Sequence, residues 1–346
     1  MSISFISYPR SLQLRGGINL DSFSFAPAAQ RLLKKRLWVL GYVAEDFPGD
    51  LSSIETLRQY GSHIDTYADF AFRLHSDASF TGHISELALE TAHAQGIAPL
   101  MLFHNFNGQI FDTQPLRAIL ATEGLQQRCI ENILQSLPTF TAGVHIDFEG
   151  VEASYRIAYN FFLESLSAAL HNQGQLLTIS LPAKRSKWEA QGYDFAEIGR
   201  ICDAITIMTF DEHFAEGSSG PVASLPWMTQ ALDYAINLIP RGKILLGTPV
   251  YGYDWSNSPA ELVPMRDIPA LITKTQARVL WSDSAVEPYF YYWQGRDKHA
   301  VWFENEISSK IRLGFVKTYR IRGIAIWRFG YETKSFWQGI TTKFKR

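Results

Sequence analysis

The residues best suited to chemistry lie in one short segment, Gly143–Glu149 (GVHIDFE). Residues two apart on a β-strand project from the same face, so His145, Asp147 and Glu149 point one way. Carboxyl groups on the inward face of a barrel are costly to bury, and near the C-terminal end of a strand they usually serve chemistry. The alternative is an edge strand with a solvated face, or a salt bridge at the barrel rim. The local pattern leaves both interpretations open.

Two neighbouring carboxyl groups suit the cleavage of a glycosidic bond. One must stay protonated to donate to the leaving oxygen, and a like charge close by raises its pKa. The other remains ionised and stabilises positive charge in the transition state. The short Asp147–Glu149 spacing leaves no room for a water on the far side of the sugar, which disfavours inversion. A retaining route needs a nucleophile, and the N-acetyl oxygen of a substrate could supply it.

Eight short apolar segments alternate with polar turns and helical patterns. Near-continuous apolar strands separated by helices favour a parallel sheet covered on its outer side, and eight such units predict closure into a (β/α)8 TIM barrel. Helices are expected from Ala158 to Leu170 and from about Ser308 to Tyr319. The expected strands are Leu37–Val43, Ile64–Phe72, Ile97–His104, Gly143–Glu149, Leu176–Leu181, Ala204–Phe210, Ile244–Val250 and Gly323–Trp327.

The stretch between the last two expected strands is too long for an ordinary connection. Residues 254–305 are therefore expected to form a small inserted α+β lobe. This stretch holds a run of aromatic residues, which could line one wall of a groove, although packing onto the barrel is the expected role of most. Residues 1–36 are expected to form an N-terminal extension, and residues 37–346 the barrel that carries the insertion.

Composition narrows the class of partner. Of the 346 residues 46% are hydrophobic, and 32 Lys and Arg against 34 Asp and Glu give a formal charge of −2 with no long run of either sign. A nucleic-acid partner is not expected, because no basic stripe is visible. No stretch approaches membrane-spanning length, so no membrane association is expected. Trp, Tyr and Phe make up 14% of the chain, and flat aromatic rings suit stacking on sugars as well as core packing.

No metal or cofactor site is expected. The nine His residues are scattered without HExxH or paired cysteines, and neither GxGxxG nor GxSxG occurs. Cys129 and Cys202 are expected to be inert core residues. The N-terminus (MSISFISYPR) has no basic start followed by an apolar run, so no standard secretory signal is predicted.

Asp147-Phe148-Glu149 resembles the end of the DxxDxDxE signature of glycoside hydrolase family 18. Other segments agree with that family in order and spacing, and together they resemble its spore-cortex fragment-lytic, YaaH-like branch over residues 37–337. These segments are MTFDEH (Met208–His213), GPVASLPW (Gly220–Trp227), LGTPVYGYDW (Leu246–Trp255), VWFENEISSKI (Val301–Ile311) and GIAIW (Gly323–Trp327).

The resemblance implies a role for each matching residue. Glu149 would be the general acid/base, Asp147 would orient the acetamido group of the substrate, and Asp211 would complete the acidic cluster. The substrate-binding positions implied are Met208, Phe210, Tyr251, Trp327, His145 and Asn105, with Trp327 as the hydrophobic floor and Asn105 as a candidate for the wall. Without the resemblance, Met208 and Tyr251 read as core residues, Trp327 as a packing residue and Asp211 as a helix cap.

Three positions depart from the signature. Ala142 and His145 stand where its first two aspartates are expected, and Phe210 stands where a tyrosine usually precedes Asp211. The loss of that hydroxyl would remove a bond to the acetamido oxygen, and the loss of one such stabiliser costs about 2.7–4 kcal/mol in other enzymes.

Three functions remain open at this point. The first is a retaining N-acetylglucosaminidase acting on peptidoglycan or spore-cortex fragments, the second a chitinase-like hydrolase of chitooligosaccharides, and the third a carbohydrate-binding barrel without turnover. A glycan is the partner expected in each case, and no obligate protein partner is expected. The branch implies a protein that stays in the cytoplasm of a mother cell or is associated with the spore.

Overall fold

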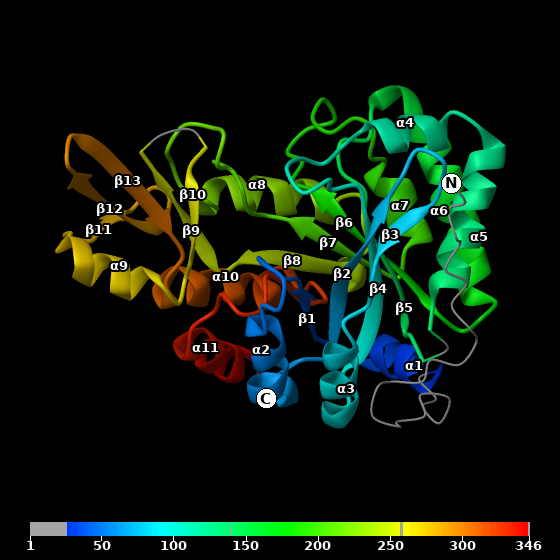
Figure 1. The fold of residues 1–346 in the computed structure, drawn as a ribbon, viewed down its shortest axis with the longest axis horizontal. Helices are drawn as coiled ribbons and strands as arrows, with labels where there is room; N and C mark the ends of the chain where they lie inside the picture. The colour runs from blue at the N-terminus through cyan, green and yellow to red at the C-terminus, as the bar shows by residue number, and fades with distance from the viewer. Residues whose placement is uncertain (1–25, 139, 257–258, 345–346) are drawn as a thin grey trace.

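The computed structural model describes residues 26–138, 140–256 and 259–344. Within this part, eight parallel strands close into a barrel in the order β1, β2, β4, β5, β6, β7, β8, β14, and β14 pairs with β1 (Figure 1). The predicted (β/α)8 fold is confirmed. The strands are β1 (Trp38–Val43), β2 (Thr66–Leu74), β4 (Ala98–His104), β5 (Gly143–Asp147), β6 (Leu176–Pro182), β7 (Ala204–Met208), β8 (Ile244–Pro249) and β14 (Gly323–Trp327), with β3 (Phe80–Gly82) antiparallel to β2.

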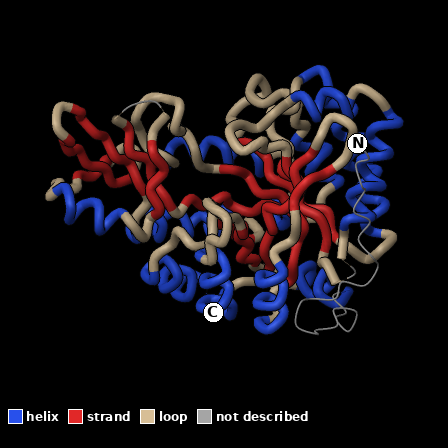
Figure 2. Tube along the Cα trace, viewed as in Figure 1, coloured by secondary structure: helices blue, strands red, loops and turns tan. Residues whose placement is uncertain are grey.

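Helices cover the outside of the barrel, as the blue and red traces of Figure 2 show. Every residue of β1, β4, β5 and β8 is buried, which explains why these strands read as continuous apolar runs. The helices are α1 (Ala26–Lys34), α2 (Ser52–Tyr60), α3 (Glu86–Gln95), α4 (Gln114–Leu120), α5 (Glu123–Ser136), α6 (Arg156–His171), α7 (Phe195–Ile201), α8 (Leu225–Ile236), α10 (Glu306–Tyr319) and α11 (Lys334–Phe344), with single 3-10 turns at Gly61–His63, Ala153–Tyr155 and Arg241–Lys243.

The two predicted helices correspond to α6 and α10. In α6, Leu163, Leu166 and Leu170 are buried at helical spacing. In α10, the side chain of Asn305 accepts hydrogen bonds from two backbone N–H groups of the first turn, which fixes where the helix begins.

An inserted lobe lies between β8 and β14, at the left of Figure 1. It contains a five-stranded antiparallel sheet in the order β10, β9, β13, β12, β11, and one further helix. The small α+β insertion of the prediction is confirmed, but its sheet begins at Tyr251 rather than near 254, because a new strand starts almost directly after β8. Its elements are β9 (Tyr251–Trp255), β10 (Glu261–Pro264), α9 (Ile268–Thr275), β11 (Leu280–Ser282), β12 (Glu287–Gln294) and β13 (Asp297–Phe303).

The predicted N-terminal extension falls largely outside the described residues, which begin at position 26. Its described part, α1, packs on the barrel through buried Ala29 and Leu32. The Trp38 indole N–H donates to the backbone oxygen of Leu32 at 2.6 Å. Helix α1 is therefore attached to the first barrel strand.

Two barrel strands end two residues earlier than expected. The ladder of β5 ends at Asp147, which lies opposite His104 of β4, so Glu149 lies just beyond the sheet. The ladder of β7 likewise ends at Met208, so Phe210 lies in the following loop. Beyond the end of β5, side-chain hydrogen bonds hold the backbone of residues 148–151.

Candidate active site

The carboxyl groups of Asp147 and Glu149 lie at the C-terminal end of the barrel, where β5 ends; this end is called the barrel mouth below. Asp147 is 4% exposed, and Glu149 is partly exposed. The Asp147 Oδ1 atom is buried without a hydrogen-bond partner. A buried, unsatisfied carboxylate oxygen is unusual in a folded protein. It is therefore available to a bound group.

Asn105 holds the backbone of Glu149. Its Oδ1 accepts the Glu149 backbone N–H at 2.8 Å, and its Nδ2 donates to the Glu149 carbonyl oxygen at 2.8 Å. The same Nδ2 donates to the carbonyl of Asp112 at 2.9 Å, and the residue is 1% exposed. Asn105, proposed as part of the pocket wall, thus acts here through the backbone of Glu149.

Tyr193 holds the same segment from the other side. Its hydroxyl donates to the carbonyl oxygen of Phe148 at 2.8 Å and accepts the Val151 backbone N–H at 3.3 Å. Tyr193 is buried in the long connection between β6 and α7. No local sequence signal marks Tyr193, because its contacts join segments more than forty residues apart.

The electrostatics of the site favour a protonated Glu149. Burial, the nearby Asp147 and then Asp211 raise the pKa of Glu149 well above its usual range. Burial raises the pKa of Asp147 to about 7, although a hydrogen bond from Ser180 opposes this shift. Like charges in a low-dielectric site keep one partner neutral. The three carboxyl groups are thus close enough to influence one another.

Asp211 lies in the loop after β7, with a backbone φ of +60°. Its Oδ1 accepts hydrogen bonds from the hydroxyls of Tyr251 at 2.6 Å and Tyr253 at 3.0 Å. Burial raises the pKa of Asp211 to about 6 in spite of these bonds. Tyr253 was not predicted, although the alternation in Tyr251-Gly-Tyr253 places both rings on one face of β9.

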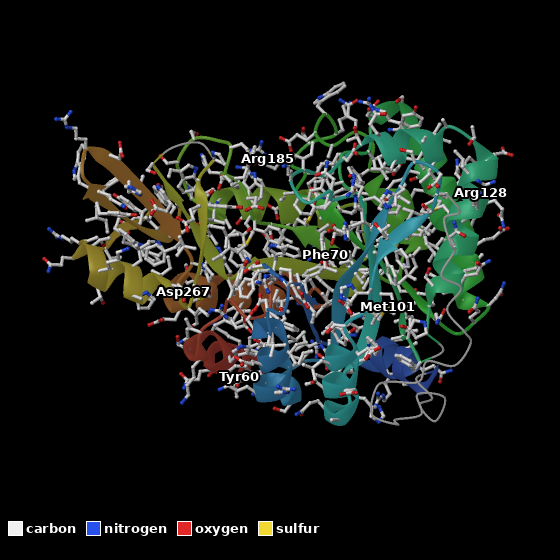
Figure 3. All side chains as sticks on the ribbon, viewed as in Figure 1. Tyr60, Phe70, Met101, Arg128, Arg185 and Asp267 are labelled. Atoms are coloured by element: carbon white, nitrogen blue, oxygen red, sulfur yellow. The ribbon has the colours of Figure 1, made fainter. Side chains whose placement is uncertain are left out.

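The predicted aromatic positions lie around the same barrel mouth. Trp327 is the last residue of β14, is partly exposed, and has its ring centroid 5.2 Å from that of Tyr42 and 5.5 Å from that of Phe70. Phe70, labelled near the centre of Figure 3, stacks on His104 at 4.0 Å. The rings of Tyr42 and Phe70 were not predicted. Phe70 is partly exposed and extends the aromatic surface that begins at Trp327, whereas Tyr42 is buried behind the Trp327 ring.

Met208 and Phe210 lie at and just after the end of β7, which only β8 separates from β14 in the barrel. Both are partly exposed. The Phe210 ring lies 6.4 Å from the ring of Tyr251, edge to face. The ring also lies against Gly247 of β8, where a side chain would meet it at 2.9 Å. Phe210 therefore packs beside the Asp211 cluster.

His145 lies one layer deeper than Asp147, inside the barrel. It is fully buried, and its ring nitrogens contact Thr178 at 2.9 Å and Ser180 at 2.8 Å. Ala142 is buried ahead of β5. His145 was proposed as a substrate-binding position, but its neighbours here are protein side chains.

In the described part of the chain, no group of three His, Cys, Asp or Glu residues is arranged to hold a metal ion. Among the same residues, no helix has the length and apolar character needed to cross a bilayer. Cys129 and Cys202 are both free and buried.

Comparisons with known proteins agree with this geometry. The model of glycosyl hydrolases family 18 matches residues 101–332. An uncharacterized glycosylase of Bacillus subtilis, YvbX, is 28% identical over 84% of this chain and 88% of its own length.

Two solved structures share the fold and a similar level of identity. A chitinase from Chromobacterium violaceum superposes with a TM-score of 0.82 at 26% identity, covering 90% of this chain and 99% of the chitinase. The spore cortex-lytic enzyme SleL of Bacillus cereus superposes with a TM-score of 0.82 at 25% identity, covering 89% of this chain and 74% of SleL. The likeness to the spore-cortex-lytic branch is thereby confirmed. The barrel, the carboxyl pair at its mouth and the family match together show that this chain belongs to glycosyl hydrolase family 18.

Proposed function

We propose that this protein is a retaining, substrate-assisted glycosidase of the N-acetylglucosaminidase type that cleaves peptidoglycan or spore-cortex fragments. The observation that carries the proposal is the pairing of Glu149, whose pKa is raised well above its usual range, with a buried Asp147 at the barrel mouth. A proton donor at neutral pH and a neighbouring group that can orient an amide are what this reaction needs.

In the proposed reaction, Glu149 donates its proton to the glycosidic oxygen as the bond from that oxygen to the anomeric carbon breaks. The carbonyl oxygen of the substrate's own N-acetyl group attacks the anomeric carbon and forms an oxazolinium intermediate. Asp147 orients the acetamido N–H and balances the positive charge. A water molecule then attacks the anomeric carbon and opens the oxazolinium ring, while the Glu149 carboxylate takes up a proton from that water. Because the anomeric carbon is attacked twice, its configuration is retained.

The Asp211 cluster is proposed to contact the same acetamido group or its sugar. Phe210 lacks the hydroxyl that the family usually presents at this point, but the Tyr251 and Tyr253 hydroxyls both lie on Asp211. We propose that one of them turns toward the substrate and replaces the missing donor. A preorganised donor of this kind stabilises charge that develops in the transition state.

The choice of peptidoglycan rests on the likeness to SleL, whose description is a spore cortex-lytic enzyme. Mass spectrometry of the products from muramic-lactam-containing cortex fragments tests it. We expect fragments cut on the reducing side of N-acetylglucosamine. If the protein cleaves chitooligosaccharides but leaves the cortex fragments uncleaved, peptidoglycan is rejected as the substrate.

A chitinase-like hydrolase is the second candidate. The observation that favours it is the match to the C. violaceum chitinase along 99% of that chain, whereas SleL extends beyond the matched region. The same chemistry serves both substrates. The two digestions run in parallel therefore separate the candidates by product masses alone.

A binding protein without turnover is the third candidate, because Ala142 and Phe210 depart from the family signature. Against it stands the raised pKa of Glu149, since a protein that only binds sugar has no need of a proton donor. Binding of either glycan by a folded protein that gives no product from cortex fragments or chitooligosaccharides would favour this candidate.

A further inference from the structure

A closed set of hydrogen bonds fills the barrel interior directly beneath Asp147. Its members are Tyr42 of β1, His145 of β5, and Thr178 and Ser180 of β6, all buried. The His145 ring contacts Thr178 Oγ1 through Nδ1 at 2.9 Å, and through Nε2 it contacts Ser180 Oγ at 2.8 Å and the Tyr42 hydroxyl at 3.3 Å. The two hydroxyls also contact each other at 3.0 Å.

These contacts fix the tautomer of His145. Thr178 has one hydroxyl proton, and it donates this proton to the carbonyl oxygen of Val144 at 3.0 Å. Thr178 must therefore accept from His145, so Nδ1 carries a hydrogen. Burial lowers the pKa of His145 to about 3, so the ring is neutral and Nε2 is a bare acceptor.

Nε2 accepts one hydrogen, but two hydroxyls lie within reach of it. Ser180 also lies beside Asp147. His145 and Ile146 of β5 pair with Thr178 and Ile179 of β6, so the next residues along the two strands, Asp147 and Ser180, are neighbours on the inward face. The Ser180 proton can therefore point to His145 or to Asp147. In the present structure Ser180 contacts His145 at 2.8 Å and Asp147 Oδ1 has no partner, which is the first arrangement.

Each arrangement suits one charge state of Asp147. When Asp147 is protonated, Ser180 donates to His145 Nε2 and is free to accept. When Asp147 is ionised, Ser180 turns its proton to the carboxylate, and Tyr42 donates to Nε2 in its place. In either state every buried hydroxyl has an acceptor for its proton. A buried network is stable only when this condition is met.

We propose that His145 is a positioning residue that lets Ser180 exchange its proton between Asp147 and the imidazole, so that both charge states of Asp147 are supported without a second carboxyl group. The proposal rests on the catalytic role assigned to Asp147 above. His145 replaces an acidic residue of the family signature by a neutral acceptor, which avoids placing another negative charge beside Asp147. The titratable groups that influence Asp147 or are influenced by it are Tyr42, Glu149, Tyr159 and Tyr193.

The proposal makes opposite predictions for two substitutions. His145→Phe removes the acceptor, so the Ser180 proton has no acceptor beyond Asp147 and Tyr42; the protonated state of Asp147 is then disfavoured and its pKa falls. Ser180→Ala removes the donor that supports the ionised carboxylate, so the pKa of Asp147 rises. Each shift is expected to be about one unit or more, the size of a hydrogen bond to a buried charge.

The test is a pH titration of the aspartate side-chain carboxyl carbons by 13C NMR, with Asp147→Asn to assign the signal. This measurement needs no turnover, so its outcome is independent of whether the proposed hydrolysis occurs. His145→Gln, which places a neutral amide oxygen near the position of Nε2, is expected to restore the wild-type titration. Measuring kcat and KM separately for each variant then shows whether the change in the pKa of Asp147 alters turnover or only substrate binding.

Shifts of the same sign in His145→Phe and Ser180→Ala, or no shift in either, would overturn the proposal. So would a His145→Gln protein that titrates like His145→Phe. Should the Phe variant fail to fold, Ser180→Ala and His145→Gln still decide the matter, because a rise in the first and no change in the second are required.

Discussion

At the scale of single residues, the position of Glu149 depends on side chains that bond the backbone around it. Asn105 bonds both backbone groups of Glu149, and Tyr193 bonds the backbone on either side of it. Glu149 lies beyond the last ladder bond of β5, so these contacts replace the sheet. A proton donor must be held within hydrogen-bond reach of its target, and small displacements are costly.

Asn105→Ala is predicted to lower kcat about tenfold or more and to destabilise the fold by about 2 kcal/mol, because a buried N–H and two carbonyls lose their partner. Steady-state kinetics and chemical denaturation measure the two effects. Asn132→Ala serves as the control: it removes a hydrogen bond from α5 to the carbonyl of Ala78, leaves the backbone contacts of Glu149 intact, and should leave kcat unchanged. Equal kcat values for wild type and Asn105→Ala would contradict the positioning role.

Asp147 gives a prediction for stability against pH. Its pKa in the folded protein is raised from 3.8 to about 7 by burial. The protonated group therefore contributes stability that is fully present below pH 3.8 and is lost as pH rises through 7. The Asp147→Asn side chain stays neutral at every pH. Its free energy of unfolding should therefore rise relative to that of the wild type between pH 4 and 7, by at most about 1.4 kcal/mol per pH unit.

Denaturation of both proteins at pH 4, 5, 6 and 7 measures this difference. A constant offset between wild type and Asp147→Asn over that range would mean that the carboxyl is not held protonated by burial. A gain of the opposite sign would mean that Asp147 is stabilised in its charged form.

The residues predicted from sequence were those with a local signal. Asp147 and Glu149 follow from strand alternation, and Asp211 and Tyr251 follow from motifs of the family. Tyr42 and Ser180 had no such signal, because they meet across the barrel although 138 positions separate them in the chain. The depth of a residue inside the barrel also has no local signal: His145, which the family signature placed among the substrate-binding positions, is fully buried.

At the scale of elements, the inserted lobe fixes the loop that carries Asp211. Glu287, at the start of β12, accepts the backbone N–H of Val222 at 2.7 Å and of Ala223 at 3.1 Å. Arg312 of α10 pairs with Glu287 and Glu304, at 3.1 Å each, and all three side chains are buried. The lobe, the loop after β7 and α10 are thereby tied together.

Glu287→Ala is predicted to destabilise the protein by about 3 kcal/mol or more, because it leaves two buried N–H groups without acceptors and weakens the pairing of a buried charge. Amide hydrogen exchange should accelerate in residues 211–223 first. The control is Glu189→Ala, which breaks an exposed pair with Arg185 and should cost less than about 1 kcal/mol. Unchanged exchange in residues 211–223 would show that the lobe does not fix this loop.

The elements themselves were largely predictable, since buried parallel strands and amphipathic helices have strong periodicities. All eight barrel strands and the insertion were expected within a few residues. The ends of β5 and β7 were not, because no sequence pattern marks where a ladder stops; after β5, for example, the backbone of Glu149 bonds the Asn105 side chain instead. The strands inside the lobe were also not resolved in the sequence, since their aromatic runs do not alternate clearly with polar residues.

At the scale of the whole molecule, closure of the barrel brings distant segments together at one end. Residues from β1, β5, β7, β9 and β14 meet at the barrel mouth (Figure 1). Active sites of TIM barrels lie at this end. The function proposed here therefore needs the entire barrel, and no single segment contains the site.

Glu149→Gln is predicted to abolish hydrolysis while leaving oligosaccharide binding within about threefold of wild type. The substitution removes the proton donor but keeps the shape and most hydrogen bonds of the side chain. Isothermal titration with the best substrate measures binding, and product analysis measures turnover. Residual turnover close to the wild-type rate would exclude Glu149 as the acid.

The central claim is that hydrolysis at this barrel mouth proceeds through attack by the substrate's own N-acetyl group, with Glu149 as acid and then base. Proton NMR of the first product formed from an N-acetylglucosamine-containing glycan, recorded before mutarotation, tests it most directly. Retention of the β configuration at the new reducing end is the predicted result. An initial α product would contradict the account, because inversion requires a water activated on the far face of the sugar.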